Sequence, residues 1–356
     1  MHRYAQRGKK AVLAMFIAVL VCACTPLTSL EVHLPELTRW TGNFDYSFFA
    51  NDYTVANTII YYKLVQEENN YWCYPVSEIL SPIAQEETTP GSLPLQAVNN
   101  TLSEICSLLN FTKVSAIGLW LQQNTAMLNL PSSFYEYIEA QKGNFPGRAL
   151  EALVLTLTEF SEVDSVQFLR RGSILSFVTV DMGPFDISRP ISRPYPNDAL
   201  ASSGQGEKVV LYWQLRGSYM LLPLTHTFSQ GAASVQVIQD LLSENPLLRR
   251  NQSEQVDLSA LLCSPLTPVF TTDGSNPWLS LHSGTLFIDL SSDIFRQQVE
   301  EEQILVALIS LTRTMLGLRE VQQVQWLVDG RVVVLSLERL SLAEPFTTLP
   351  FINLID

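Results

Sequence analysis

Charged residues are scarce in this chain, and positively charged ones are the scarcer kind. Only 16% of the 356 residues are charged, and 22 Lys and Arg stand against 35 Asp and Glu, for a formal net charge of −13. The first 23 residues hold four of the cations and no acid, so the remainder stands at −17. Because nucleic-acid binding relies on Lys and Arg at the phosphates, this balance excludes nucleic acid as a partner. The 47% of hydrophobic residues excludes a disordered chain, and the length of 356 residues suffices for two ordinary domains.

Cysteine and histidine are too few and too dispersed for a metal or cofactor scaffold. The chain has five Cys and four His, whereas haem, iron–sulfur and zinc-finger sites gather these residues at short spacings. Cys73, Cys106 and Cys263 are separated by 33 and 157 positions, which fits no metal or redox motif. We expect buried free thiols, with a Cys73–Cys106 disulfide as the alternative, and we expect no cofactor.

The apolar run near the N-terminus is too short to cross a membrane. Residues 11–21 form an unbroken run of 11 apolar residues after a basic stretch over residues 2–10. A bilayer-spanning helix needs about 20 residues, so this arrangement is typical of a secretory signal peptide.

The residues that follow this run predict a lipid anchor. Residues 21–24 read VCAC, which resembles the bacterial lipobox, where an aliphatic residue, a small residue and Ala or Gly precede the Cys that receives the lipid. We predict a lipoprotein signal peptide over residues 1–23, lipidation at Cys24 and attachment to the extracytoplasmic face of the cell membrane. A secretory signal cut after Ala23 and an uncleaved anchor remain alternatives.

Motifs for nucleophilic or zinc-dependent catalysis are missing. Neither the Gly-x-Ser-x-Gly elbow nor the His-Glu-x-x-His zinc motif occurs. The histidines after residue 24 are His33, His226 and His282, and each stands alone. A lone histidine is usually a packed or solvated side chain, so we expect no catalytic or metal-binding role for any of them.

Paired carboxylates are the remaining catalytic candidates. Glycoside cleavage needs two carboxylates about 5–10 Å apart in a cleft. The candidate pairs are Asp289 with Asp293 and Glu159 with Glu162. Asp289 falls in a run typical of a helix N-cap, and capping is the favoured interpretation. We therefore expect a protein without enzymatic activity.

The chain carries one pattern twice. Residues 119–134 match residues 279–294 at an offset of 160, and residues 149–172 match residues 307–330 at an offset of 158. The second match has ten identical positions out of 24, where unrelated segments share roughly one or two. This internal repeat predicts two copies of one structural unit.

The repeat sets the predicted domain organisation. We place the two units at residues 57–187 and 207–348. A tether over residues 24–56 precedes them, a Pro-, Ser- and Gly-rich linker over residues 188–206 separates them, and a C-terminal tail over residues 349–356 follows.

Both units are predicted to have the same elements in the same order: an apolar hairpin, a helix, a second hairpin, a second helix and a final strand pair. The expected ranges are 58–62, 71–76, 94–110, 117–130 and 148–160 in the first unit, and 209–213, 219–224, 232–244, 278–290 and 303–316 in the second. Gly172 and Gly330 mark the turn of the final strand pair, where a tight turn needs positive φ. The expected fold class is α+β, with two helices packed on one face of a small mixed sheet in each unit.

Several segments resemble the GerM domain, the sporulation and spore germination domain of bacterial lipoproteins. They are TLTEF and VQFL within residues 156–172, TLFIDLS at 285–291 and VQWLVDG at 324–330. The similarity covers about residues 58–186 and 207–347, behind the lipobox. The first copy departs from the family pattern, with NLP at 129–131 in place of Asp-Leu-Ser and RRG at 170–172 in place of Val-Asp-Gly.

This resemblance implies a scaffold rather than an enzyme. The family is similar in fold to ring-building modules of the channel complex that links mother cell and forespore, and its members are implicated in assembling that complex. The expected function is therefore a membrane-anchored lipoprotein with a scaffolding role in sporulation and spore germination at the mother cell–forespore envelope. Its expected partners are envelope or spore-channel proteins, and free sheet edges leave a homo-oligomer possible.

A cell-wall-associated lipoprotein that binds peptidoglycan is the alternative. Exposed aromatic rings would provide the platform for the sugars, and the candidates are Trp72, Trp120, Trp213, Trp278 and the cluster at 134–137. Their spacing along predicted strands favours packing in the core or between units. The strong negative charge also argues against direct binding to anionic wall polymers or lipid head groups.

Overall fold

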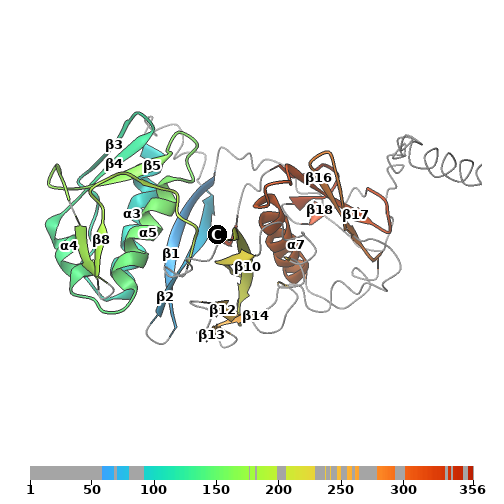
Figure 1. Cartoon of the computed structure of the whole chain (residues 1–356), viewed down its shortest axis with the longest axis horizontal. Coiled ribbons are helices and arrows are strands. Elements are labelled where there is room, and N and C mark those ends of the chain that lie inside the picture. Colours follow the sequence, from blue (N-terminus) through green and yellow to red (C-terminus); the bar gives the residue numbers. More distant parts are fainter. Residues whose placement is uncertain are drawn as a thin grey trace, which may run out of the picture.

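The computed structural model describes residues 58–67, 70–79, 92–175, 177–180, 183–198, 206–228, 237, 241, 247–249, 255–258, 261–263, 279–292, 301–332, 336–337, 340–347 and 352–355. Within these residues, helices and several small sheets form an α+β architecture (Figure 1). The predicted signal peptide, Cys24 and the tether lie outside the described residues and remain predictions. None of the helices described is both long and apolar enough to cross a bilayer.

Each repeat opens with a long antiparallel hairpin of β-branched and aromatic residues. In the first repeat β1 (Thr58–Glu67) pairs with β2 (Asn70–Ile79). In the second, β10 (Glu207–Leu215) pairs with β11 (Leu221–Phe228). Burial largely alternates along β1 and β10, as expected for strands that turn one face to a core. The predicted opening strands are confirmed, and each is longer than expected.

A mixed sheet follows in the first repeat. β3 (Gly118–Gln122) and β4 (Thr125–Leu130) form an antiparallel hairpin, and β5 (Ser165–Arg170) joins β4 in parallel. Parallel neighbours need a long crossover connection, which here contains the helices α4 (Ser132–Glu139) and α5 (Phe145–Leu157). The sequence did not predict α4 as a separate helix.

The second repeat has a mixed sheet of the same kind. β15 (Leu279–His282) pairs antiparallel with β16 (Thr285–Leu290), which pairs in parallel with β17 (Gln323–Val328). The crossover from β16 to β17 contains α7 (Glu301–Leu316). Because the matching segments of the sequence adopt matching strands and crossovers, the predicted tandem repeat is present in the structure.

The helices of the first repeat lie between two sheets, and the expected single sheet with both helices on one face is wrong. The β1–β2 hairpin and the β3–β4–β5 sheet are separate, and α3 (Ser92–Leu108) and α5 lie between them (Figure 1). The reason is that α5 is buried at 11 of its 13 residues. A helix that is apolar on nearly all sides needs cover on more than one face.

Short strands complete the described structure. They are β6 (Ser173–Ile174), β7 (Phe177–Val180), β8 (Gly183–Asp186), β9 (Ile191–Ser192), β12 (Leu247–Arg249), β13 (Gln255–Asp257), β14 (Leu262–Cys263), β18 (Ser336–Leu337), β19 (Leu340–Ser341) and β20 (Leu354–Ile355). Most of the helix predicted at 232–244 lies outside the described residues. Of that range, Val237 and Leu241 are described, and both are buried.

Parts of the predicted linker and of the predicted tail are built into the fold. β9 lies in the 188–206 segment and pairs with β5, and Asn197 of the same segment is fully buried. β20 lies in the 349–356 segment and pairs in parallel with β2 of the first repeat. Over their described residues, these two segments therefore pack against the repeats instead of running free, while the domain boundaries remain predictions.

Candidate functional site

The two predicted turn glycines lie in tight turns with equivalent geometry. Gly172 has φ 80° and Gly330 has φ 75°, and the residue before each also has positive φ, with 51° at Arg171 and 48° at Asp329. Two successive residues with positive φ are typical of a type I′ hairpin turn. The Gly172 amide donates to Asn129 Oδ1 at 3.0 Å.

Asp289 serves the turn at Gly330. The Gly330 amide donates to Asp289 Oδ1 at 2.9 Å, a turn contact that was not predicted, and most of the residues that a helix cap would serve lie outside the described residues. The amide of Ser292 instead donates to Asp329 Oδ1 at 3.1 Å. Burial raises the pKa of the Asp289 carboxyl group, with the nearby charge of Asp329 as a further cause and the Gly330 hydrogen bond acting against them. Asp293, its predicted catalytic partner, lies outside the described residues.

The second carboxylate pair is engaged in structural contacts. The Tyr62 hydroxyl donates to Glu159 Oε1 at 3.0 Å, and the Arg193 guanidinium forms an ion pair with the same oxygen. Glu162 is exposed and accepts a hydrogen bond from Ser161 at 3.4 Å. This carboxylate pair therefore offers no free acid–base couple.

The thiols and histidines are dispersed in the structure as in the sequence. Cys73, Cys106 and Cys263 are free thiols, so the alternative of a Cys73–Cys106 disulfide is wrong. Burial raises the pKa of the Cys73 thiol, which disfavours the reactive thiolate. His226 lies on β11 and the exposed His282 on β15. Among the described residues, no three His, Cys, Asp or Glu side chains are placed to hold a metal ion.

Most of the aromatic candidates for a sugar platform are packed inside. Trp72 and Trp213 are buried to 1% and 0% exposure, and Phe134 and Tyr135 of the 134–137 cluster are buried as well. Trp278 lies outside the described residues. Trp120 alone of the candidate tryptophans that are described is substantially exposed, at 46%.

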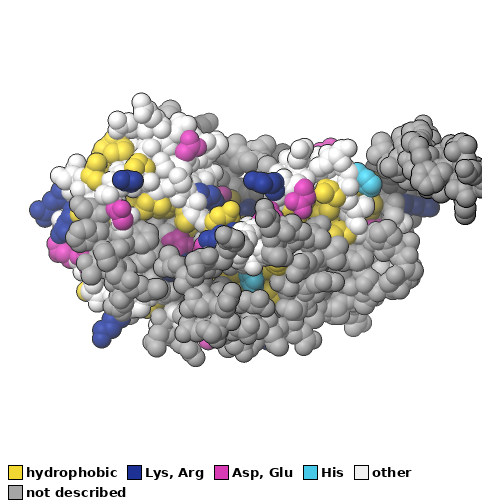
Figure 2. All heavy atoms as spheres, in the orientation of Figure 1, with side chains coloured by type: hydrophobic (Ala, Val, Ile, Leu, Met, Phe, Trp, Pro, Cys, Tyr) yellow, Lys and Arg dark blue, Asp and Glu magenta, His cyan; other side chains and the backbone are white. Residues whose placement is uncertain are grey.

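Trp120 belongs to an exposed apolar edge of the first mixed sheet. Among the described strands, β3 is the outermost at this end of the sheet, and Ile117, Trp120 and Leu121 on or beside it are 57%, 46% and 48% exposed. Figure 2 shows hydrophobic side chains gathered over β3 and β4. β3 reads GLWLQ and lacks the charges and prolines that usually protect an edge strand from pairing with another chain. We call this surface, made of Ile117, Trp120 and Leu121, the β3 edge; it is suited to contact with another protein.

The corresponding edge of the second repeat is less apolar. β15 occupies the place of β3, and its Leu281 is 39% exposed. Ser280 and His282 stand where the first repeat has Trp120 and Gln122. The repeats therefore share an architecture but differ at this surface.

Two buried asparagines at the contact between the repeats were missed by the sequence reasoning. Asn197 and Asn353 lie in the predicted linker and tail, and the side chain of each hydrogen-bonds to the hairpins of both repeats. A signal for them exists in the sequence, because PYPN at 194–197 and PFIN at 350–353 share a Pro-aromatic-x-Asn pattern at an offset of 156.

Comparison with known proteins agrees with this architecture. Residues 63–176 match the Germane family, described as sporulation and spore germination. The solved tandem GerMN domains of the sporulation protein GerM from Bacillus subtilis are 18% identical, with a TM-score of 0.54, over 83% of this chain and 99% of that chain. No curated protein matches the sequence significantly.

Two other solved structures are less similar overall. The first GerMN domain of the same Bacillus subtilis protein is 17% identical, over 38% of this chain and 98% of that chain, with a TM-score of 0.28. A putative lipoprotein from Clostridium perfringens is 16% identical, over 41% of this chain and 93% of that chain, with a TM-score of 0.21.

The family match lies within the first of the two repeats. The match over residues 63–176 runs from β1 to beyond β6 in the first repeat, and the similarity to the tandem GerMN structure extends over 83% of this chain. The first repeat therefore matches the Germane family, and the chain has a fold similar to that of tandem GerMN domains.

Proposed function

We propose that this protein is a membrane-anchored lipoprotein with a non-enzymatic scaffolding role in sporulation and spore germination. It holds envelope or spore-channel proteins together at the boundary between mother cell and forespore. The family match over residues 63–176 supports the link to sporulation and germination.

The β3 edge is the observation that carries the scaffolding part of the proposal. An uncharged edge strand offers unpaired backbone groups that a strand of another protein can extend, and its exposed side chains add apolar contact. The engaged state of Glu159 and Asp289 and the burial of Cys73 support a role without chemistry.

A C-terminal fluorescent fusion, imaged in the source organism from growth into starvation, tests the proposal. We expect the signal to gather at the membrane around the forespore. Leu121→Lys places a charge on the β3 edge and is expected to disperse that signal and to reduce cross-linking to neighbouring proteins.

Ile174→Lys is the matched control for this experiment. Ile174 is 58% exposed on β6, at the opposite end of the same sheet. Its substitution should leave the localisation intact. A uniform envelope signal in growing cells, or equal effects of the two variants, would contradict the proposed role of the β3 edge.

The lipid anchor is tested separately with Cys24→Ser. Loss of the acceptor thiol should release the protein from the membrane fraction, because two acyl chains give stable anchoring. If the variant remains in the membrane fraction, the lipid anchor is wrong.

Exposure of Trp120 keeps peptidoglycan binding as the second candidate function. Retention of the purified protein on peptidoglycan, insensitive to salt and lost in Trp120→Ala, would support this alternative over a protein scaffold.

A further inference from the structure

The two repeats meet through β2 and β11, and each of these strands carries a proline at the contact. Pro75 and Pro223 lie 148 positions apart, and each is paired within its own hairpin with a tyrosine, Tyr62 or Tyr212. A proline has no N–H to donate to a neighbouring strand. Its carbonyl oxygen still needs a hydrogen-bond donor when it is buried. Ordinary strand pairing is therefore interrupted where the repeats meet.

Asn197 provides the missing bonds on one side. Its Nδ2 donates to the carbonyl oxygens of Cys73 at 2.6 Å and of Pro223 at 2.7 Å, and its Oδ1 accepts from the Cys73 amide at 2.7 Å. One side-chain amide thus pairs with β2 as a strand would and reaches β11 as well.

Asn353 repeats this arrangement with the two strands exchanged. Its Nδ2 donates to the carbonyl oxygens of Leu221 at 2.7 Å and of Pro75 at 2.6 Å, and its Oδ1 accepts from the Leu221 amide. Leu221 follows Cys73 by 148 positions, as Pro223 follows Pro75. The two asparagines are therefore related by a local pseudo-two-fold axis between the repeats.

The residue before each asparagine contacts the hairpin of the other repeat. Pro196 follows the first repeat, and its carbonyl accepts from Thr225 Oγ1 of β11 at 2.6 Å. Ile352 follows the second repeat, and its amide donates to Ser77 Oγ of β2 at 2.7 Å while its carbonyl accepts from the Ser77 amide at 2.9 Å. β20 then extends along β2, with Ser77 opposite Leu354 and Glu78 opposite Ile355.

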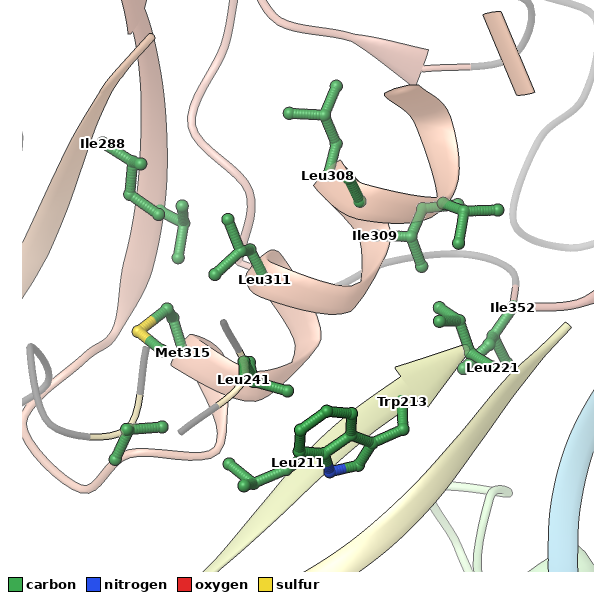
Figure 3. Packing of buried hydrophobic residues seen from close by; sticks show 14 of the residues in the cluster. Leu211, Trp213, Leu221, Leu241, Ile288, Leu308, Ile309, Leu311, Met315 and Ile352 are labelled. Carbon is green, nitrogen blue, oxygen red and sulfur yellow. The ribbon is translucent and has the colours of Figure 1, made fainter. Parts of the chain in front are cut away.

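The side chain of Ile352 packs in the core of the second repeat, whereas its backbone contacts Ser77 of the first repeat. It is fully buried in the hydrophobic cluster of the second repeat, where Figure 3 shows it beside Leu221 and near Ile309 of α7. Residues 352–355, which we call the closing segment, thus bind the first repeat through the backbone and the second through an apolar anchor.

Asparagine suits both positions on two counts. Asn197 has φ 54° and Asn353 has φ 50°, a left-handed conformation that asparagine tolerates better than most residues. Both N–H groups and the oxygen of each side chain are used, and the residues are 0% and 7% exposed. An aspartate would lose both donors and bury a charge.

We propose that the outer edge of β2, with Ser77 and the Pro75 carbonyl, is a binding site for an extended peptide in which an apolar residue precedes an asparagine. The closing segment of the same chain occupies the site and fixes the orientation of the two repeats. The site recognises its occupant by strand addition along β2, by hydrogen bonds to the side-chain amide of Asn353 and by packing of Ile352 in the hydrophobic cluster that contains Leu221.

Amide hydrogen exchange on the full chain tests the proposal at residue level. In Asn353→Ala, the Leu221 amide loses its acceptor and should exchange at least about tenfold faster, while the Cys73 amide remains protected by Asn197. Asn197→Ala is the matched control and should give the reverse pattern. Equal protection of the Leu221 amide in wild type and Asn353→Ala would overturn the proposal.

A second experiment asks whether the site accepts the peptide in trans. A chain that ends at residue 349 is titrated with a fluorescent peptide of residues 346–356, followed by anisotropy. We expect saturable binding that weakens at least about tenfold when the peptide carries Asn353→Asp, and no binding to the full chain, whose site is occupied. Equal binding of both peptides, or no binding to a folded truncated chain, would overturn the proposal. If the truncated chain does not fold, the exchange pattern of the full-length variants decides.

Discussion

Asn129 and Asp289 occupy equivalent positions in the two repeats and differ in charge. A side-chain oxygen of each accepts a hydrogen bond from the amide of the turn glycine, Gly172 or Gly330, at 3.0 Å and 2.9 Å. Burial raises the pKa of the Asp289 carboxyl group, so the charged form is disfavoured in the folded protein. The neutral side chain of Asn129 accepts the equivalent hydrogen bond from Gly172 without the penalty of burying a charge.

We expect Asp289→Asn to stabilise the protein at neutral pH. Because the folded-state pKa of Asp289 is raised, its contribution is most favourable below the unfolded-state pKa and is lost as pH rises through the folded-state pKa. The neutral amide keeps the acceptor for Gly330 and removes this loss. Thermal melts should show a higher Tm than wild type at pH 7 and a smaller difference in acid. A lower Tm at pH 7 would show that the charge is favourable.

Gly330→Val should destabilise the turn through the backbone. A Cβ at Gly330 would meet only Asp289 Oδ2, at 3.9 Å, so space is available, but φ 75° is unfavourable for a β-branched residue. We expect a loss of about 1–2 kcal/mol in the free energy of unfolding, measured by urea denaturation. Gly147→Ala in α5, where a Cβ meets nothing within 4 Å and φ is not positive, is the control and should not destabilise. An unchanged midpoint for Gly330→Val would contradict the turn.

At the scale of elements, one threonine in each crossover helix is bonded to the opening hairpin. The Tyr62 amide donates to Thr156 Oγ1 at 3.0 Å, and the Tyr212 amide donates to Thr314 Oγ1 at 3.3 Å. Thr156 also donates to the carbonyl of Ala152 at 2.8 Å. In each repeat a threonine hydroxyl of the helix thus accepts a hydrogen bond from a strand amide. These bonds join α5 to β1 and α7 to β10.

Thr156→Val should weaken the contact between α5 and β1. The substitution keeps the size of the side chain but leaves the buried Tyr62 amide without its acceptor, at a cost of about 1–3 kcal/mol. Urea denaturation measures the loss, and Thr156→Ser, which retains the hydroxyl, should lose less. If the serine variant is the less stable of the two, packing of the methyl group outweighs the hydrogen bond.

The elements that follow a local pattern are those that could be predicted from the sequence. The β-branched and aromatic runs and the internal repeat predicted the positions of β1, β2, β10 and β11 and of both mixed-sheet hairpins. The placement of α5 between two sheets could not be predicted from its local sequence pattern, because strands distant in the sequence contribute to its burial. Lipidation at Cys24 lies outside the described residues and stays a prediction.

The asparagine contacts escaped prediction for a physical reason. Asn197 and Asn353 lie in segments whose composition or length indicates a linker and a tail. Their partners on β2 are backbone carbonyls 124 and 278 positions away along the chain. Backbone groups carry no sequence signature, so only the repeated Pro-aromatic-x-Asn pattern could have marked the site.

At the scale of the whole molecule, the two repeats share part of one core. Trp72 belongs to β2 of the first repeat, yet it packs in the hydrophobic cluster that holds Trp213, Leu221 and Trp326 of the second. It is 1% exposed, and the guanidinium of Arg148 lies 5.8 Å from the centre of its ring. Because the cluster crosses from one repeat to the other, loss of one repeat exposes apolar surface of both, and the repeats should unfold together.

Trp72→Ala should therefore separate the unfolding of the two repeats. Removing a fully buried tryptophan costs about 3–5 kcal/mol, and here much of that loss falls on the contact between repeats. We expect calorimetry to show one transition for the wild-type protein and two for Trp72→Ala. Trp72→Phe keeps an aromatic ring in the cluster and should retain a single transition at a lower temperature. A single transition in Trp72→Ala would mean that the asparagine contacts and the closing segment suffice to couple the repeats without the shared core.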